Sequence, residues 1–249
     1  MQRYFIPADR FGSDTVHITG DDAHHLANVM RAKAGDTVIV ADGSGREAIV
    51  KVSSLSKNEI SAEILELRES VSEPRVRITI AQAMPKADKM ETIIQKGTEI
   101  GAAGFIPFNS ERTIVQYDAK KEHKRLERWS KISKEAAEQA HRGRIPDIAP
   151  VCSWKELLGL AEKADAAFFC YEKESNLTLR KHLDRLKIEE KANIMLIIGP
   201  EGGFSEKEAR EAEEAGCLTV SLGRRILRTE TAALVGMSCI LYEYGEIGG

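Results

Sequence analysis

The chain has 249 residues, of which 42% are hydrophobic and 30% charged, and its formal net charge is −3. These values predict a globular protein of one large or two ordinary domains, and they argue against a general nucleic-acid coat protein. No apolar run approaches the roughly 18–20 residues of a membrane span, and the first residues lack the apolar segment of a signal peptide, so we expect a cytoplasmic protein without membrane contact.

The first 72 residues predict a small β-rich domain with one short helix. An Asp-Gly-Ser-Gly turn at residues 42–45 is a strong hairpin signal. A helix is expected to open at residue 20, with Leu26, Val29 and Met30 on one face. A charged stretch from Glu66 to Pro74 then predicts a linker and a domain boundary after residue 72. The expected strands are residues 4–6, 15–18, 36–40, 47–52 and 60–67.

Residues 73–249 alternate between strands and helices, which predicts a parallel sheet covered by helices on both faces. Two helices are marked by a serine with a glutamate three residues later, at Ser153 and at Ser205. The expected strands are residues 75–81, 104–108, 165–170, 194–198 and 217–222. The other expected helices are residues 88–100, 123–140, 176–186 and 229–244.

A glycine-rich turn at residues 199–203 lies between an apolar strand and a helix. Strand, turn and helix in this order form ligand sites at the carboxyl edge of α/β sheets. The turn has neither of the glycine patterns that bind nucleotide phosphates, and its central Glu201 would repel a polyphosphate. We therefore expect a ligand with hydroxyls, amines or positive charge, lying close to Gly202. The alternative is a turn that only reverses the chain.

Two further loops, residues 171–175 and 223–230, follow strands at the same predicted edge of the sheet. The second loop carries three arginines together with Ile226 and Leu227, and a short exposed loop seldom has two such large apolar side chains. Either these two side chains form the wall of a pocket for a flat ring, or they close the end of the sheet.

Charge and cysteine spacing bear on nucleic acid and metal binding. Residues 112–144 contain ten basic and five acidic residues, so this span could hold a phosphate backbone. The four cysteines lie far apart, without a C-x-x-C pair, and no histidines have H-x-x-x-H spacing. We therefore expect no metal site.

Several motifs along the whole chain carry a family resemblance. They are residues 1–6, 24–31, 35–36, 42–43, 96–101, 111–112, 135–142, 198–204 (IGPEGGF) and 222–232 (LGRRILRTETA), of which the last two together are specific. On these motifs the chain resembles the bacterial 16S ribosomal RNA uridine-N3 methyltransferases, the RsmE family, which belong to the SPOUT superfamily of trefoil-knotted enzymes.

The resemblance implies an α/β fold in two domains. Residues 1–72 would form a PUA-like RNA-binding β-barrel, and residues 73–249 a SPOUT methyltransferase domain with a trefoil knot near the C-terminus. It also implies a homodimer with the last helix in the interface, where Ala233, Gly236 and Met237 would permit close helix packing. The three loops would hold S-adenosylmethionine through Tyr171, Gly199, Pro200, Glu201, Gly202, Leu222, Gly223, Ile226, Leu227, Arg228, Thr231 and Ala232.

The implied reaction is methylation of N3 of a uridine in 16S rRNA of the small ribosomal subunit. Because N3 must lose its proton, a cation near the ring oxygens would stabilise the developing charge, and Arg228 is the candidate. Glu201 is the second catalytic candidate, but whether it or another group takes the proton stays open. The expected RNA contacts are Arg3, Arg10, Arg31, Lys86, Lys89, Arg112 and Arg142.

Two rival functions remain at this point. One is an RNA-binding assembly factor whose pocket is vestigial, although the pocket motifs are intact. The other is a nucleotide-dependent enzyme that uses residues 199–203 as a phosphate loop, which the missing Lys-Ser/Thr pair disfavours.

Overall fold

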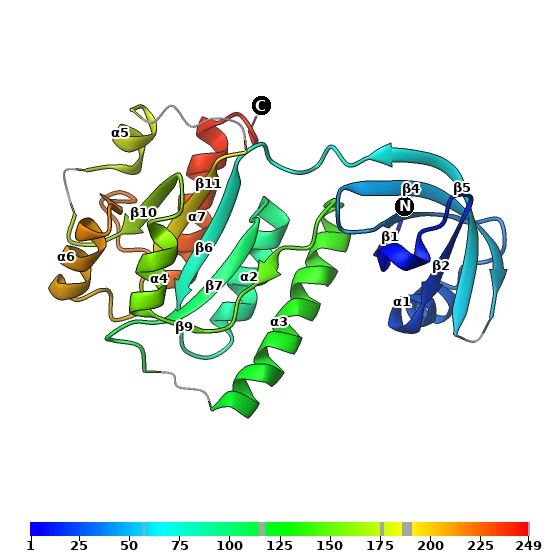
Figure 1. Ribbon diagram of the computed structural model, residues 1–249, viewed down its shortest axis with the longest axis horizontal. Helices are drawn as coiled ribbons and strands as arrows, with labels where there is room; N and C mark the ends of the chain where they lie inside the picture. Colours follow the sequence, from blue (N-terminus) through cyan, green and yellow to red (C-terminus); the bar gives the residue numbers. More distant parts are fainter. Residues whose placement is uncertain (57, 115–117, 175–176, 186–190, 249) are drawn as a thin grey trace. The chain divides into compact units, whose positions relative to one another are not determined.

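The computed structural model describes residues 1–56, 58–114, 118–174, 177–185 and 191–248. The chain divides into two compact units, shown in Figure 1. The first unit comprises residues 1–73 together with residues 134–145, and the second comprises residues 74–133 and 146–249. The sequence did not indicate that residues 134–145 return to the first unit. No helix in the described ranges is long and apolar enough to cross a bilayer.

The first unit is a five-stranded sheet in the order β1-β3-β4-β5-β2, with β1 and β3 parallel and the other pairs antiparallel. Two register shifts in the long β4–β5 ribbon bend it, and no pairing between described strands closes β2 onto β1. The sheet is therefore a curled half-barrel with a main apolar core, and a smaller cluster joins Phe5 and Ala41 to Ala137. Its elements are β1 (Arg3–Phe5), η1 (Ala8–Arg10), β2 (Thr15–Thr19), α1 (Gly20–His24), η2 (His25–Val29), β3 (Thr37–Ala41), β4 (Arg46–Leu55) and β5 (Glu59–Glu69).

Two expectations for the first unit are wrong. The helix that starts at Gly20 widens into a π-helical turn at η2, which rotates the following side chains. As a result Leu26 is buried as expected, whereas Val29 and Met30 are 60% and 42% exposed. In addition, β5 continues to Glu69, two residues beyond the expected strand, so the start of the expected linker is strand.

The second unit contains a parallel sheet in the order β12-β10-β11-β6-β7-β8, with β9 paired to β7. The parallel α/β architecture is confirmed, and only the two-residue strands β8 and β9 were not expected, because they are too short to show a pattern. The strands are β6 (Arg77–Ala83), β7 (Gly104–Asn109), β8 (Asp147–Ile148), β9 (Cys152–Ser153), β10 (Ala166–Cys170), β11 (Asn193–Ile198) and β12 (Leu218–Val220). The helices are α2 (Lys89–Ile100), α3 (Ala119–Gln139), α4 (Trp154–Ala161), α5 (Leu179–Leu183), α6 (Glu206–Glu214) and α7 (Thr229–Glu243).

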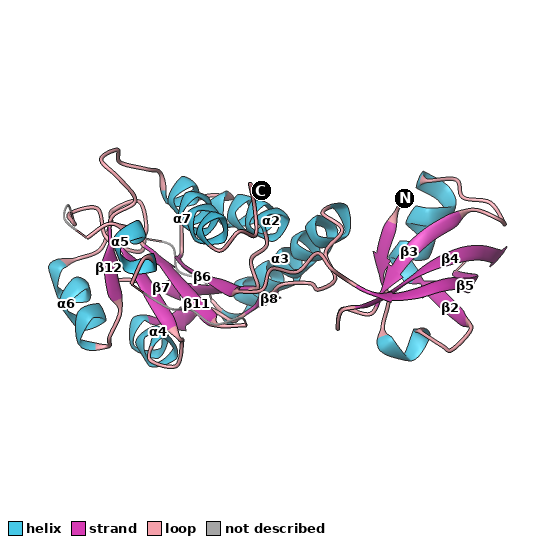
Figure 2. Ribbon diagram, turned by 90° about the horizontal axis from the view of Figure 1, so that it is seen from above, coloured by secondary structure: helices cyan, strands magenta, loops and turns pink. Residues whose placement is uncertain are grey.

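Helices cover both faces of this sheet, with α2 and α7 on one face and α4 and α6 on the other (Figure 2). An apolar core lies under each group of helices. Along β11, Ile194 and Leu196 pack into the core shared with α2 and α7, while Met195 and Ile197 pack into the core shared with α4 and α6. This alternation follows from the two-residue period of a strand. Both faces of β11 are therefore buried, which explains its continuous apolar sequence.

Two helix starts agree with their capping signals, while α3 begins four residues earlier than expected, at Ala119. Ser153 and Ser205 each form the expected reciprocal capping box with the glutamate three residues later. The helix expected at residues 176–186 is shorter: α5 begins after Thr178, whose side chain accepts a hydrogen bond from the Lys181 amide. Residues 176 and 186, like residue 175 of the first loop, lie outside the described residues.

The small residues of α7 pack differently from the expectation. Ala233 and Met237 are fully buried in the core of their own unit. A Cβ at Gly236 would lie 2.9 Å from Leu196 Cδ2 on β11. These three residues therefore bring α7 close to its own sheet and are not available to pack against a second subunit.

Two helix glycines provide a matched stability prediction. In α2, a Cβ at Gly97 would lie 2.8 Å from the buried Phe105 ring, whereas a Cβ at Gly159 in α4 meets nothing within 4 Å. Gly97→Ala should therefore lower the free energy of unfolding by about 1–3 kcal/mol through overpacking. Gly159→Ala should raise it by about 0.5–1 kcal/mol through helix propensity. Urea unfolding checks both signs, and a stable Gly97→Ala variant would contradict the close approach.

Candidate functional site

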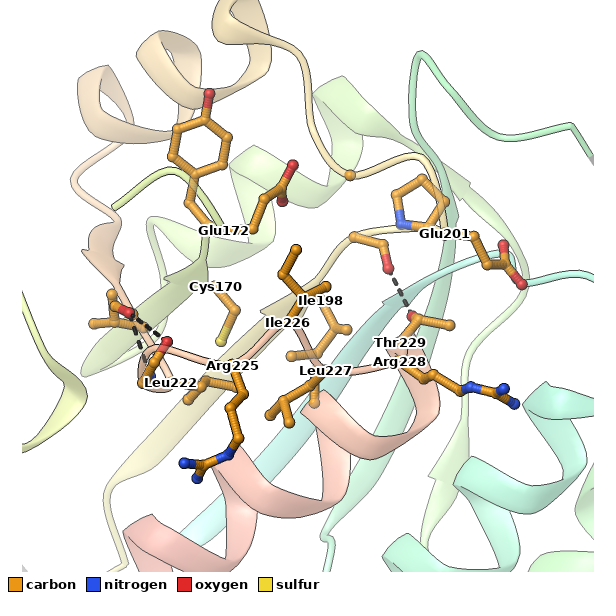
Figure 3. A pocket seen from close by; sticks show the side chains of 18 of the residues that line it. Cys170, Glu172, Ile198, Glu201, Leu222, Arg225, Ile226, Leu227, Arg228 and Thr229 are labelled. Atoms are coloured by element: carbon orange, nitrogen blue, oxygen red, sulfur yellow. Dashed lines mark hydrogen bonds between the residues drawn. The ribbon is translucent and has the colours of Figure 1, made fainter. Parts of the chain in front are cut away.

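A pocket of about 610 Å³ lies in the second unit at the carboxyl ends of β10, β11 and β12. These strands are adjacent and parallel, so the three loops that follow them meet at one edge of the sheet. The remaining wall comes from the start of α7 and from Lys89 at the start of α2. The volume suits a ligand of cofactor size. Figure 3 shows the side chains around it.

The glycine turn is fixed from two sides. Thr229 Oγ1 donates to the Gly199 carbonyl over 2.7 Å and accepts from the buried Gln82 Nε2 over 2.8 Å. On the other side, Arg112 Nη1 donates to the Gly202 carbonyl over 2.8 Å. The turn is thus held to the end of β6, to the start of α7 and to the segment after β7. Sequence reasoning missed Gln82 and Thr229, although a single amide in an apolar strand was a usable signal.

Glu201 is held by donors on and next to α2. Lys89 Nζ lies 2.8 Å from Glu201 Oε1, which also accepts the Lys86 amide over 3.1 Å. Partial burial favours the neutral acid, but the hydrogen bonds from Lys89, from its own amide and from the Lys86 amide outweigh burial and lower the pKa of Glu201. Its ionised form therefore persists at lower pH, which makes this carboxylate a weaker base.

The charge of Glu201 does not make the pocket negative. Lys89 neutralises it, and the pocket lining contains four cationic and two anionic side chains, Lys89, Arg224, Arg225 and Arg228 against Glu172 and Glu201. The repulsion of phosphates expected from the sequence is therefore cancelled by a lysine that is distant in the chain.

The arginine-rich loop presents both apolar side chains and backbone donors. Ile198, Leu222 and Leu227 contribute apolar surface to the pocket, and Ile226, although part of the lining, is 91% exposed and lies at the rim. Within the described part of the chain, the amide groups of residues 224–227 have no hydrogen-bond partner. An apolar floor beside unpaired backbone donors is suited to the face and edge of a flat heteroaromatic ring.

The pocket brings together all the expected cofactor residues except Thr231, which is absent from the lining. It adds Glu172, Gly203 and Thr229, which belong to the three expected loops but were not singled out, and Cys170 at the end of β10. No group of three or more potential metal ligands occurs among the described residues.

The expected RNA contacts separate into two groups. Arg10, Arg31, Lys86 and Arg112 are exposed, and Lys89 is half-buried in the pocket wall. Arg3 and Arg142, in contrast, are only 5% and 3% exposed, so they do not fit the expectation. Arg3 pairs with Glu47 and Arg142 with Glu73, each at 2.6 Å, because a buried guanidinium needs a carboxylate partner.

Gly203, and not Gly202, is the crowded glycine of the turn. Its φ is +65°, and an added Cβ would overlap the Glu172 carboxylate, whereas a Cβ at Gly202 would only touch Arg112 at 3.5 Å. Gly203→Ala should therefore displace Glu172 and the turn, and it should weaken ligand binding by about tenfold or more. Gly202→Ala should weaken it by less than about threefold. Calorimetry with the methyl donor compares the two, and equal losses would contradict this assignment.

Both units of the chain match known protein families. Residues 72–241 match the model of an RNA methyltransferase domain, and residues 18–65 match an RNA methyltransferase PUA domain. The fold and the site thus define an RNA methyltransferase with a PUA domain, as the resemblance implied.

Similar proteins from other bacteria show which RNA methyltransferase family this is. The ribosomal RNA small subunit methyltransferase E of Bacillus subtilis is 40% identical, with 98% of this chain and 97% of that protein covered. The Synechocystis protein of the same name is 33% identical over 96% of this chain and 76% of its own. The chain belongs to the ribosomal RNA small subunit methyltransferase E family and is an rRNA methyltransferase. The crystal structure of the Neisseria gonorrhoeae member bound to S-adenosyl methionine has a TM-score of 0.84 and 31% identity, with 97% of each chain covered.

Proposed function

We propose that this enzyme transfers a methyl group from S-adenosylmethionine to N3 of a specific uridine in 16S rRNA of the small ribosomal subunit. The observation that carries the proposal is the pocket, which joins an apolar floor with backbone donors to a mouth that carries Arg228. Family membership supports rRNA as the substrate. That the methylated nucleoside is a uridine of 16S rRNA, and that the methyl group goes to N3, is our inference from the resemblance and the site.

The cofactor is S-adenosylmethionine, which the Neisseria gonorrhoeae relative contains. The residues of the pocket fit its parts. Leu222 and Leu227 would lie against the adenine, and the amides of residues 224–227 would bind its edge. The carboxylates of Glu172 and Glu201 suit an amino group and ribose hydroxyls. The bound cofactor supplies an electrophilic methyl group on a sulfonium centre.

The protein's own residues would prepare the uridine. Loss of the N3 proton spreads negative charge over the two ring oxygens, and the Arg228 guanidinium at the pocket mouth would stabilise it. Glu201 suits this proton transfer poorly, because Lys89 lowers its pKa and engages one of its oxygens. We therefore propose that Glu201 binds and positions ligand groups in the pocket and does not take the N3 proton.

The proposal also includes the homodimer, the knot, the RNA contacts and the cytoplasmic location that the resemblance implies. The outer side of α7 carries the exposed Tyr242 and the partly exposed Leu234 and Val235, which supports a homodimer. A threaded C-terminal segment is part of the proposal through the family resemblance. Exposed Arg10, Arg31, Lys86 and Arg112 would contact RNA, and the enzyme would act in the cytoplasm.

A methyl-transfer assay tests the proposal. The protein is incubated with methyl-labelled S-adenosylmethionine and small ribosomal subunits from cells that lack it, and digested nucleosides are analysed by mass spectrometry. We expect one labelled 3-methyluridine in 16S rRNA. Label on another nucleoside would refute the proposed atom, and binding of subunits without label transfer would favour an assembly factor.

A further inference from the structure

A second cleft, of about 770 Å³, lies in the first unit and shares no lining residue with the pocket. The turn between β3 and β4 contributes Ser44, Gly45 and Arg46, and the end of β5 contributes Arg68. Arg144 completes it from the segment that returns to this unit. We call it the hairpin cleft. None of the RNA contacts expected from the sequence lies in its lining.

Two carboxylates in and next to this cleft, Glu73 and Glu47, are already neutralised. Glu73 accepts from Arg142 Nη2 over 2.6 Å and from the amides of Gly143 and Arg144 over 3.0 and 3.2 Å. The buried Glu47 is paired with Arg3 and with Arg68 of the cleft. In the described ranges, Glu69 is the one carboxylate of the cleft for which the structure shows no hydrogen bond or ion pair.

The three arginines of the cleft are held in place but remain accessible. Arg68 binds Glu47 through Nε, and Arg144 Nη2 donates to the Ser44 carbonyl over 3.0 Å. Arg46 donates Nε to Asp42 over 3.0 Å and lies 4.2 Å from the centre of the Phe11 ring. The side chains of Arg46 and Arg68 are still 42% and 38% exposed. Because a guanidinium has five N–H donors, each arginine keeps donors for a ligand at little entropic cost.

Two glycines shape the cleft. A Cβ at Gly143 would overlap Ser70, so only glycine lets the returning segment approach the end of β5. Gly45 has a φ of +110°, and nothing lies within 4 Å of an added Cβ, so its backbone is open to a ligand. The cleft is thus a built feature in which segments distant in the chain are packed closely together.

We propose that the hairpin cleft binds the sugar–phosphate backbone of the rRNA substrate. The planar fork of a guanidinium matches phosphate oxygens, and three such groups from three chain segments suit phosphates spaced along a strand better than one small anion. Such contacts position the RNA without reading its bases. This inference rests on the proposed function, since it assigns part of that substrate to a second surface.

Variants that remove the charges test the proposal. Arg46→Gln and Arg144→Gln, alone and together, are compared by fluorescence anisotropy with a labelled RNA oligonucleotide over a potassium chloride series. Each change should raise the Kd about fivefold to tenfold and reduce the slope of log K against log salt by about one. Glu69→Gln should lower the Kd. Arg210→Gln on α6 is the matched control and should not change it, because Arg210 lies outside both sites.

Further measurements on the same variants keep the outcomes distinct. S-adenosylmethionine affinity should stay at the wild-type value in the double variant, while the KM for small subunits rises. An unchanged Kd and salt slope in the double variant would overturn this proposal and leave the proposed function intact. RNA binding that depends on the cleft, without any 3-methyluridine, would instead refute the proposed function. Complete competition by millimolar inorganic phosphate at constant ionic strength would show a single-anion site and would overturn the backbone assignment.

Discussion

Arg228→Ala should lower kcat for methyl transfer by about 10²–10³-fold, the effect of removing one donor that stabilises developing negative charge. Arg228 lies at the pocket mouth and at the first position before α7, where its side chain forms no capping hydrogen bond. It is also exposed, so its removal leaves no buried group unpaired. The free energy of unfolding should therefore change by less than about 0.5 kcal/mol.

The control variants distinguish charge from structure. Arg228→Lys retains the positive charge without the planar fork, so it should recover part of the lost rate. Arg210→Ala, an exposed arginine outside the pocket, should retain wild-type activity. Single-turnover rates and urea unfolding are measured on the same preparations. A loss of stability that parallels the loss of rate, or a normal rate for Arg228→Ala, would show that Arg228 is structural.

The site could be predicted from the sequence to the extent that it is local. The three loops follow buried strands, and parallel strands bring their carboxyl ends to one edge, so residues 199–203 and 222–228 had to meet. What could not be predicted was pairing between distant segments. Lys89 and Glu201 are far apart in the chain but 2.8 Å apart in space, and this contact neutralises the charge that was expected to repel phosphates.

In the fold, too, local features could be predicted and long-range packing could not. Capping boxes and apolar strands depend on residues within a few positions, and they were located correctly at Ser153, Ser205 and β11. The π-helical turn at η2 and the return of residues 134–145 depend on packing against other segments, which no period of the sequence encodes. Arg3 is the clearest case, because an arginine near the N-terminus suggests surface and RNA, yet its side chain is only 3% exposed.

Removal of the carboxylate that pairs with Arg3 should unfold much of the first unit. Glu47 and Arg3 have side chains only 5% and 3% exposed and lie 2.6 Å apart, and Glu47 also accepts from Arg68 Nε. Glu47→Ala would leave the Arg3 guanidinium buried without a countercharge, which costs about 3–5 kcal/mol. Hydrogen exchange of residues 37–55, read by mass spectrometry, measures this loss where it occurs.

A second probe shows whether the damage stays local. Trp129 and Trp154, the two tryptophans of the chain, belong to the second unit, so their fluorescence reports the unfolding of that unit. A single two-state transition should not be assumed for two units. We expect faster exchange in residues 37–55 before the tryptophan signal changes. Simultaneous loss of both signals would show that the two units unfold cooperatively.

The double variant Arg3→Met with Glu47→Leu tests the physical reason. If the cost of Glu47→Ala is the unpaired buried charge, removal of both charges should recover at least half of the lost stability, because an apolar pair of similar volume avoids the desolvation cost. Recovery should be incomplete, since Arg3 Nη1 also donates to the Arg142 carbonyl over 2.7 Å, and that carbonyl would lose its partner. A double variant as unstable as Glu47→Ala would show that packing, and not charge, determines stability at this position.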